Sequence, residues 1–175
     1  MKETQNESTV SISLLRILKG YAVGLGLDFP VIASSAGVDP SVLKDDRTRV
    51  SGKQFECMWR QITACGKDPN PGLSFGRELA RNYPGGSVVF TMMMNCATVG
   101  SALEAFVRYH RIMADAVQPQ LRLSGDRVHL FWHAPHRGFP AHPDLSEALL
   151  CIFHSILDHL TQGRLNPIEV RFTHS

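Results

Sequence analysis

His110 is the side chain with the clearest capacity for ligand chemistry. The stretch 98–113, TVGSALEAFVRYHRIM, repeats apolar residues at helical spacing, and His110 lies on that apolar stripe. An imidazole in apolar surroundings needs a hydrogen-bond partner. The sequence therefore predicts either a histidine at the edge of the core, bonded to a backbone group or a carboxylate, or a histidine that contacts a ligand.

Apolar residues near this helix could line an adaptable binding cavity. Residues 87–95, SVVFTMMMN, carry three adjacent methionines, whose flexible thioethers suit such a surface, although methionine runs also form plain core. Arg108 or Arg122 could hold a carboxylate of a ligand. The candidate ligand-binding residues are Phe90, Met93, Met94, Phe106, Arg108, His110, Leu123, Leu130 and Trp132.

The sequence shows no convincing catalytic or metal-binding constellation. Gly72 to Gly76 match G-x-S-x-G, but a nucleophile elbow at Ser74 needs a buried strand before it, and KDPNP at 67–71 cannot form one. Several histidines lie in the second half of the chain, yet no carboxylate or cysteine is spaced to complete a tetrahedral metal site. We therefore expect a binding domain and no enzyme, with no metal or cofactor.

Composition limits the class of protein further. The chain has 175 residues, which favours a single domain, and a net charge of +2, which is too balanced for a basic nucleic-acid-binding face. Its four cysteines include no C-x-x-C pair, which is typical of small core residues in a reducing compartment. Residues 10–27 are apolar but interrupted by Arg16 and Lys19, so they predict no membrane span. We expect a cytoplasmic protein that does not contact membranes.

Helices are predicted in the first part of the chain. Residues 29–43 form two short helices joined at Gly37, which look like a helix-turn-helix; the acidic Asp39, Asp45 and Asp46 would repel DNA there. Ser51 and Gln54 have the spacing of a capping box. The predicted segments are a flexible tail over 1–9, helices over 11–25, 51–65 and 72–80, a loop over 82–86 and a helix over 87–95.

The periodicity changes after the helix that carries His110. Two short alternating segments, 120–123 and 128–133, flank Ser-Gly-Asp-Arg and predict a β-hairpin. A loop over 134–143, a helix over 144–162 and a last strand over 168–173 follow. The predicted fold is α+β: an N-terminal helical bundle, then helix, β-hairpin, helix and strand, with a small antiparallel sheet packed on helices.

Five stretches, in this order, resemble the N-terminal sensing domain of AraC-type transcriptional regulators, in the helix-rich subgroup labelled arabinose-binding-like. They are SAGVD at 35–39 with Leu43, Arg49-Val50 with Phe55 and Trp59, DPNPGLSFG at 68–76, TVGSAL at 98–103 with Arg108-Tyr109, and PIEVRFTH at 167–174. The resemblance covers about residues 12–174 and implies that 10–175 form one effector-sensing domain.

The resemblance also implies partners. Family regulators carry two helix-turn-helix units at the C-terminus, and this sequence contains neither, so we interpret the chain as a fragment that meets DNA only through a C-terminal domain absent from it. A small-molecule effector is the expected partner, and a homodimer is left open. The effector would bias the DNA-binding unit by its different affinity for two states.

Three alternatives stay open from the residues. The order helix, hairpin, helix, strand also resembles haem–nitric-oxide-binding domains, with His110 as the axial ligand and HAPHR at 133–137 in place of their Tyr-x-Ser-x-Arg motif, of which only the arginine is kept. A hydrolase using Ser74 and autonomous DNA binding by residues 29–50 are the other two.

Overall fold

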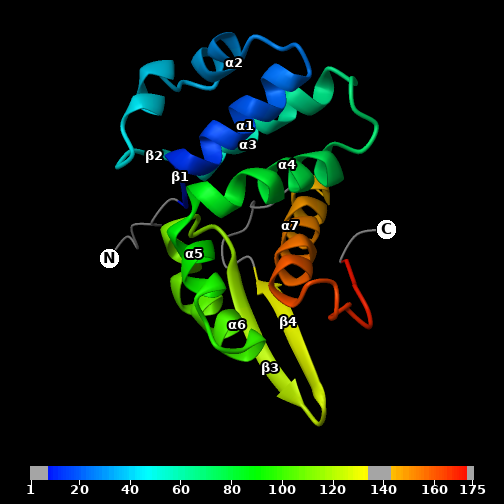
Figure 1. The fold of residues 1–175 in the computed structure, drawn as a ribbon. Coiled ribbons are helices and arrows are strands. Elements are labelled where there is room, and N and C mark those ends of the chain that lie inside the picture. Colours follow the sequence, from blue (N-terminus) through cyan, green and yellow to red (C-terminus); the bar gives the residue numbers. More distant parts are fainter. Residues whose placement is uncertain (1–7, 134–142, 173–175) are drawn as a thin grey trace, which may run out of the picture.

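Helices from the beginning of the chain form one layer, and a long helix crosses beneath them to meet the remaining elements (Figure 1). The computed structural model describes residues 8–133 and 143–172, except for the side chains of 83–86. The elements are β1 (Thr9–Ser11), α1 (Ile12–Gly24), α2 (Phe29–Ser35), the 3-10 helix η1 (Pro40–Lys44), β2 (Arg49–Ser51), α3 (Gly52–Ala64), α4 (Pro71–Gly86), α5 (Val88–Met94), α6 (Val99–Tyr109), the 3-10 helix η2 (His110–Ile112), β3 (Gln118–Ser124), β4 (Arg127–His133) and α7 (Pro143–Thr161).

The predicted α+β class is confirmed, and local side-chain caps explain where several helices begin. Ser51 and Gln54 form a reciprocal capping box at α3, with Gln54 N–H donating to Ser51 Oγ at 3.2 Å. Thr98 caps α6 in the same way, with Ser101 in the role usually held by glutamate or glutamine. Ser87 both ends α4 and caps α5. These caps satisfy backbone N–H groups that the helices cannot bond internally.

The first layer buries an aromatic cluster. Trp59 of α3 lies with its ring centroid 5.1 Å from that of Phe75 in α4 and 6.1 Å from that of Tyr21 in α1. The Tyr21 hydroxyl donates to Asp68 Oδ2 at 2.9 Å. α1, α3 and α4 are thereby held around one core.

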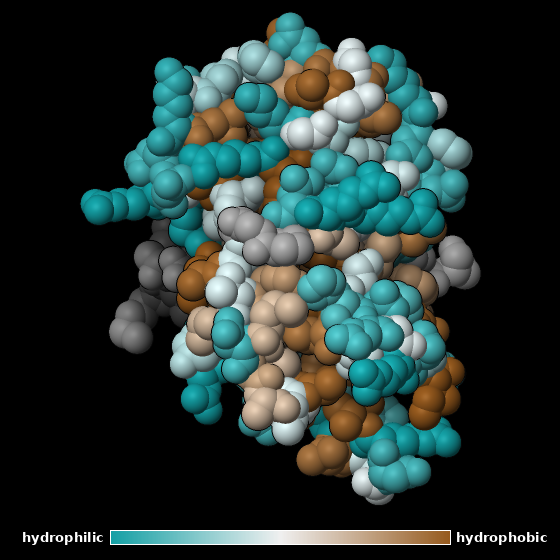
Figure 2. All heavy atoms as spheres, viewed as in Figure 1, coloured by the Kyte–Doolittle hydropathy of each residue, from teal (hydrophilic) through white to brown (hydrophobic). Residues whose placement is uncertain are grey.

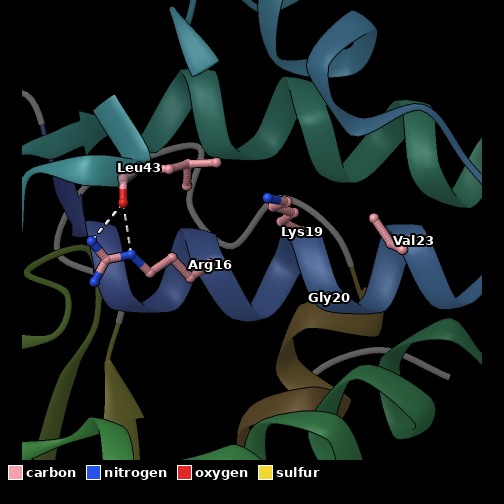
Figure 3. A pocket seen from close by; sticks show the side chains of 5 residues that line it. All are labelled: Arg16, Lys19, Gly20, Val23 and Leu43. Atoms are coloured by element: carbon pink, nitrogen blue, oxygen red, sulfur yellow. Dashed lines mark hydrogen bonds between the residues drawn. The ribbon is translucent and has the colours of Figure 1, made fainter. Parts of the chain in front are cut away.

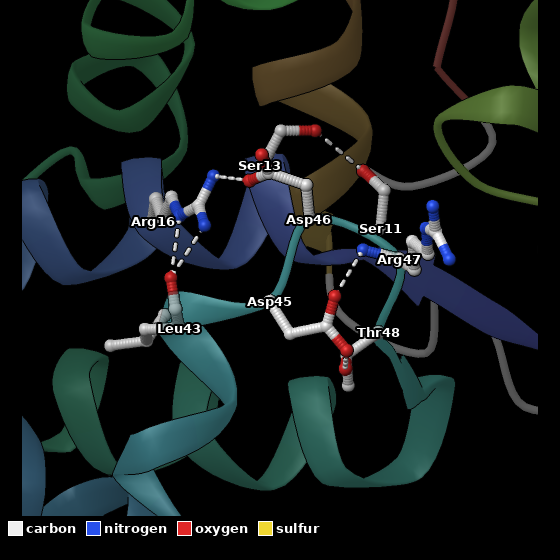
Figure 4. A network of polar contacts seen from close by, with 8 residues as sticks. All are labelled: Ser11, Ser13, Arg16, Leu43, Asp45, Asp46, Arg47 and Thr48. Atoms are coloured by element: carbon white, nitrogen blue, oxygen red, sulfur yellow. Dashed lines mark hydrogen bonds and ion pairs between the residues drawn. The ribbon is translucent and has the colours of Figure 1, made fainter.

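The loop between η1 and β2 is fixed to α1 by charged side chains (Figure 4). Arg16 Nε donates to the Leu43 carbonyl at 2.9 Å, and its Nη1 pairs with Asp46. Asp45 accepts from the backbone N–H of Arg47 and from the Thr48 hydroxyl. η1 is a short 3-10 helix that these contacts hold against α1. Residues 29–44 therefore form a corner of the helical layer.

α4 and α7 approach each other closely because two glycines of α4 face α7. A Cβ at Gly72 would lie 2.3 Å from the Asp144 carbonyl oxygen, and one at Gly76 would lie 2.6 Å from Cys151 Cβ. Both distances are shorter than atoms can approach. The spacing G-x-x-x-G, which the G-x-S-x-G match contains, therefore serves helix packing.

A short seam of backbone hydrogen bonds joins the helical layer to the rest of the chain. β1 pairs antiparallel with β2, and Val10 also bridges to Ala114, just after η2. Ser11 N–H donates to the Met113 carbonyl at 2.8 Å, and Asp115 N–H donates to the Thr9 carbonyl at 3.2 Å. Residue 9, predicted to belong to a flexible tail, is thus part of a strand; residues 1–7 of that tail lie outside the described residues.

β3 and β4 form the predicted hairpin, with Ser124 opposite Arg127 around a two-residue turn. Gly125 has φ +62° there, in the left-handed region that glycine tolerates. Cross-strand pairs alternate in facing: Pro119 opposite Trp132 shares one face with the Leu121–Leu130 and Leu123–Val128 pairs. The predicted loop over 134–143 lies outside the described residues except for residue 143, which begins α7.

Two predictions of local structure are wrong. Residues 82–86 continue α4 and are not a loop, because buried Phe75 and Leu79 anchor the helix and outweigh the low helix propensity of its end. Residues 168–172 form no strand, since none of the described strands pairs with them. Ile168 is 81 % exposed, so the apolar side chain that begins this alternating pattern is not buried against the core. Among the described residues, no helix is long and apolar enough to cross a membrane.

Candidate functional site

Three aromatic side chains from separate elements meet beneath the hairpin. The ring of Phe106 (α6) lies 4.9 Å from that of Phe153 (α7), and Phe153 lies 5.0 Å from Trp132 (β4), both edge to face. Such contacts stabilise beyond the area they bury. The half-buried Leu121 and Leu130 of the hairpin also pack against the core. We call Phe106, Trp132 and Phe153 the hairpin cluster.

His110 lies at the edge of the hairpin cluster, where α6 passes into η2. It is 8 % exposed, and its ring centroid lies 6.4 Å from that of Phe106. Its Nδ1 lies 2.9 Å from the Val107 carbonyl oxygen, whereas its buried Nε2 has no hydrogen-bond partner within the described part of the chain. Burial lowers the pKa of His110, against smaller opposing effects of the Val107 and Val117 backbone. The imidazole is therefore neutral near pH 7.

The structure brings together some of the predicted ligand-binding residues. Phe106, His110, Leu130 and Trp132 gather at the hairpin cluster, as described above. Phe90 and Met93 are buried on the neighbouring α5, which packs against α6.

Other predicted ligand-binding residues lie apart from this site. Leu123 is near the hairpin tip and is 82 % exposed, Met94 is exposed on α5, and Arg108 is exposed on α6. Arg122 lies over the ring of Phe131, on the hairpin face opposite to Trp132. Neither arginine is thus placed to hold a carboxylate at the hairpin cluster.

Phe153, at the centre of the hairpin cluster, was absent from the predicted site. Its inward position on helix 144–162 follows from helical periodicity, but that periodicity does not indicate that α7 meets β4. Leu121 was also absent, since strand alternation places Leu121 and Leu123 on one face but does not show which of them packs against the core. Only the tertiary contact between two elements distant in sequence identifies both residues.

The remaining candidates for chemistry have structural roles. Ser74 lies in the first turn of α4 and follows a non-strand segment, so no nucleophile elbow exists there. Burial raises the pKa of the Cys151 thiol, which keeps it protonated beside Gly76. No group of three or more potential metal ligands occurs among the described residues. Of the haem-like motif, His133 ends β4, and residues 134–137 lie outside the described residues.

A hollow in the helical layer, away from the hairpin cluster, is a weaker candidate site (Figure 3). It encloses about 400 Å³ between α1 and η1 and is lined by Arg16, Lys19, Gly20, Val23 and Leu43. The guanidinium of Arg16 is already bonded to the Leu43 carbonyl and to Asp46. Because that cation is satisfied within the protein, the hollow offers little beyond Lys19 to fix a ligand.

Exposed apolar side chains occur around the hairpin. In Figure 2, apolar side chains are visible at the lower end of the molecule, where the hairpin lies, as well as on the helical layer at the top, and hydrophilic ones cover much of α4. Val128 and Phe131 of β4 are among the exposed apolar residues. The hairpin therefore covers the cluster with its inner part and presents apolar side chains to solvent near its tip, at Leu123 and Val128, and on its opposite face, at Phe131.

Comparison with known protein families identifies the family to which the chain belongs. Residues 26–175 match the model of the arabinose-binding domain of AraC transcription regulators, N-terminal. The chain belongs to this family. No curated protein matches the chain. The predicted relationship to AraC-type sensing domains is thus confirmed, and the family is a domain of transcription regulators.

Proposed function

We propose that this arabinose-binding-family domain senses a small-molecule effector at the hairpin cluster and controls a DNA-binding domain. The family match over residues 26–175 carries the proposal. The cluster supports it because it joins three elements around apolar rings with one unsatisfied imidazole nitrogen, a composition typical of ligand sites.

The seam at β1 provides a physical connection from this site to the helical layer. His110 begins η2, and η2 is followed within three residues by Met113, Ala114 and Asp115, which bond to β1. Arg49 reinforces the seam: its guanidinium donates to the Ile112 carbonyl at 2.9 Å and to Thr9 Oγ1 at 2.7 Å. An effector that repacks η2 would therefore also shift β1 and α1, which follows β1 in the chain. This shift would favour one of two states of the regulator.

Effector binding is tested by thermal unfolding with compounds of different chemistry, arabinose included. A ligand at one hundred times its Kd adds about 2.7 kcal/mol to the free energy of unfolding. For a domain of this size that corresponds to a rise in Tm of roughly 5–10 °C. Phe131→Ala, on the opposite hairpin face, should keep the response, and Phe106→Leu should weaken it. An effector whose response is unchanged by Phe106→Leu would place the site elsewhere.

The output is proposed to require a DNA-binding domain outside this sequence. The chain alone should give no salt-sensitive shift of duplex DNA in gels, whereas a chain that includes helix-turn-helix units should bind DNA in an effector-dependent way. We further expect the protein to act in the cytoplasm, where DNA and metabolites are both available. Salt-sensitive DNA binding by this chain would contradict the assignment of DNA recognition to another domain.

A further inference from the structure

The protonation state of His110 follows from its hydrogen bond. A carbonyl oxygen only accepts, so the contact of 2.9 Å between Nδ1 and the Val107 oxygen requires a proton on Nδ1. Since the buried imidazole is neutral, its second nitrogen carries no proton. Nε2 is therefore a buried hydrogen-bond acceptor that receives no donor from the described residues.

Among the described residues around the ring, none donates to Nε2. Phe106 flanks the ring on one side, and the backbone of Val117 lies near enough to favour the protonated form, as an acceptor does. The nearby charged groups are Arg111, which disfavours a proton on the ring, and Asp115, which favours one. Asp115 is itself engaged by Thr9, whose N–H and hydroxyl both donate to it. A buried acceptor without a donor destabilises the folded protein. A ligand that supplies the donor removes this cost when it binds.

We propose that the effector presents an N–H or O–H donor to His110 Nε2 while its apolar part packs against Phe106 and Trp132. The ligand class is thus an amine, amide, alcohol or phenol with an apolar body. A carboxylate directed at Nε2 is disfavoured, because two lone pairs would face each other. The proposal rests on the proposed sensing function and specifies what the site recognises.

The tautomer is tested first, on the full chain labelled with ¹⁵N-histidine. The ring spectrum should show His110 protonated on Nδ1 and unprotonated on Nε2 at pH 7.5. His110→Phe identifies its signals by removing them, and His154→Gln, which alters an exposed histidine of α7, should leave them unchanged. A proton on Nε2 of His110, alone or together with one on Nδ1, would overturn the proposal.

Donor recognition is tested with matched probes at millimolar concentration: phenol, anisole, which lacks the donor, and benzoate. Phenol should move the His110 Nε2 resonance, and anisole and benzoate should move it much less. His110→Phe should weaken phenol binding about three- to tenfold, the loss expected for one hydrogen bond, and should affect anisole little. Equal responses to phenol and anisole, or no response to phenol, would contradict the proposal.

The outcomes separate this inference from the sensing function. If an effector raises Tm but its binding leaves the Nε2 resonance unmoved, sensing is supported and the role of His110 is refuted. If phenol moves Nε2 but no metabolite raises Tm, donor recognition by His110 is supported and the sensing function is weakened. A Soret band on addition of haemin, lost in His110→Phe, would assign Nε2 to iron and refute donor recognition.

Discussion

Alanine at position 76 should destabilise the domain, although alanine is a better helix former than glycine. A Cβ there would lie 2.6 Å from Cys151 Cβ and 2.9 Å from the Ala148 carbonyl oxygen. Neither atom is at the end of a flexible side chain, so α4 and α7 must separate. Overpacking of this kind costs about 1–3 kcal/mol. The intrinsic gain of alanine over glycine in a helix is only about 0.5–1 kcal/mol.

The net expectation for Gly76→Ala is a loss of about 1–2 kcal/mol, measured as the free energy of unfolding in urea by circular dichroism. Gly20→Ala is the matched control, because Gly20 is exposed in the interior of α1 and its nearest neighbour to a new Cβ is Glu78 Oε1 at 3.9 Å. This variant should gain about 0.5–1 kcal/mol.

Opposite signs for the two variants would show that packing against α7, and not helix propensity, decides the effect at position 76. If Gly76→Ala proved as stable as the unaltered chain or more stable, the close approach of α4 and α7 would be refuted. Gly72→Ala extends the test, since its obstacle is the backbone of Asp144, only 2.3 Å from the new Cβ.

Three further predictions concern the hairpin cluster and the seam. Phe153→Ala should lower the free energy of unfolding by about 3–5 kcal/mol, and Phe131→Ala by no more than about 1 kcal/mol; similar losses would contradict the facing of the hairpin. Arg49→Lys should cost about 1–2 kcal/mol in urea unfolding, since an ammonium cannot replace the branched contacts of the guanidinium; an unchanged midpoint would refute its role in the seam. Because burial lowers the pKa of His110, the unfolded chain takes up the proton first as the pH falls below about 6.5, so stability decreases there. His110→Phe should flatten that part of the stability–pH profile, and an unaltered slope would contradict a neutral, buried imidazole.

Local signals in the sequence were sufficient for most of the helices and for the hairpin. A capping serine or threonine, such as Ser51 or Thr98, satisfies N–H groups within a few residues, so its effect is visible in the sequence itself. The same holds for the alternation of β3 and β4 around Gly125, whose conformation the turn requires. The apolar stripe of α6 likewise identified His110 as a buried imidazole, because helical periodicity is a local property.

Contacts between distant elements were decided only by the tertiary structure. The segment 168–172 has the alternation of a strand but joins neither sheet of the described residues, because a strand needs a neighbouring edge and not only a pattern. Leu123 and Leu121 share one face of β3, yet only Leu121 packs against the core, since the hairpin extends beyond the helices near its tip. The sequence already argued against a catalytic role for the G-x-S-x-G match, but only the approach of α7 gives Gly72 and Gly76 their steric role. The sequence by itself therefore determined most of the elements and the family, whereas the packing of the elements decided which side chains meet at the site.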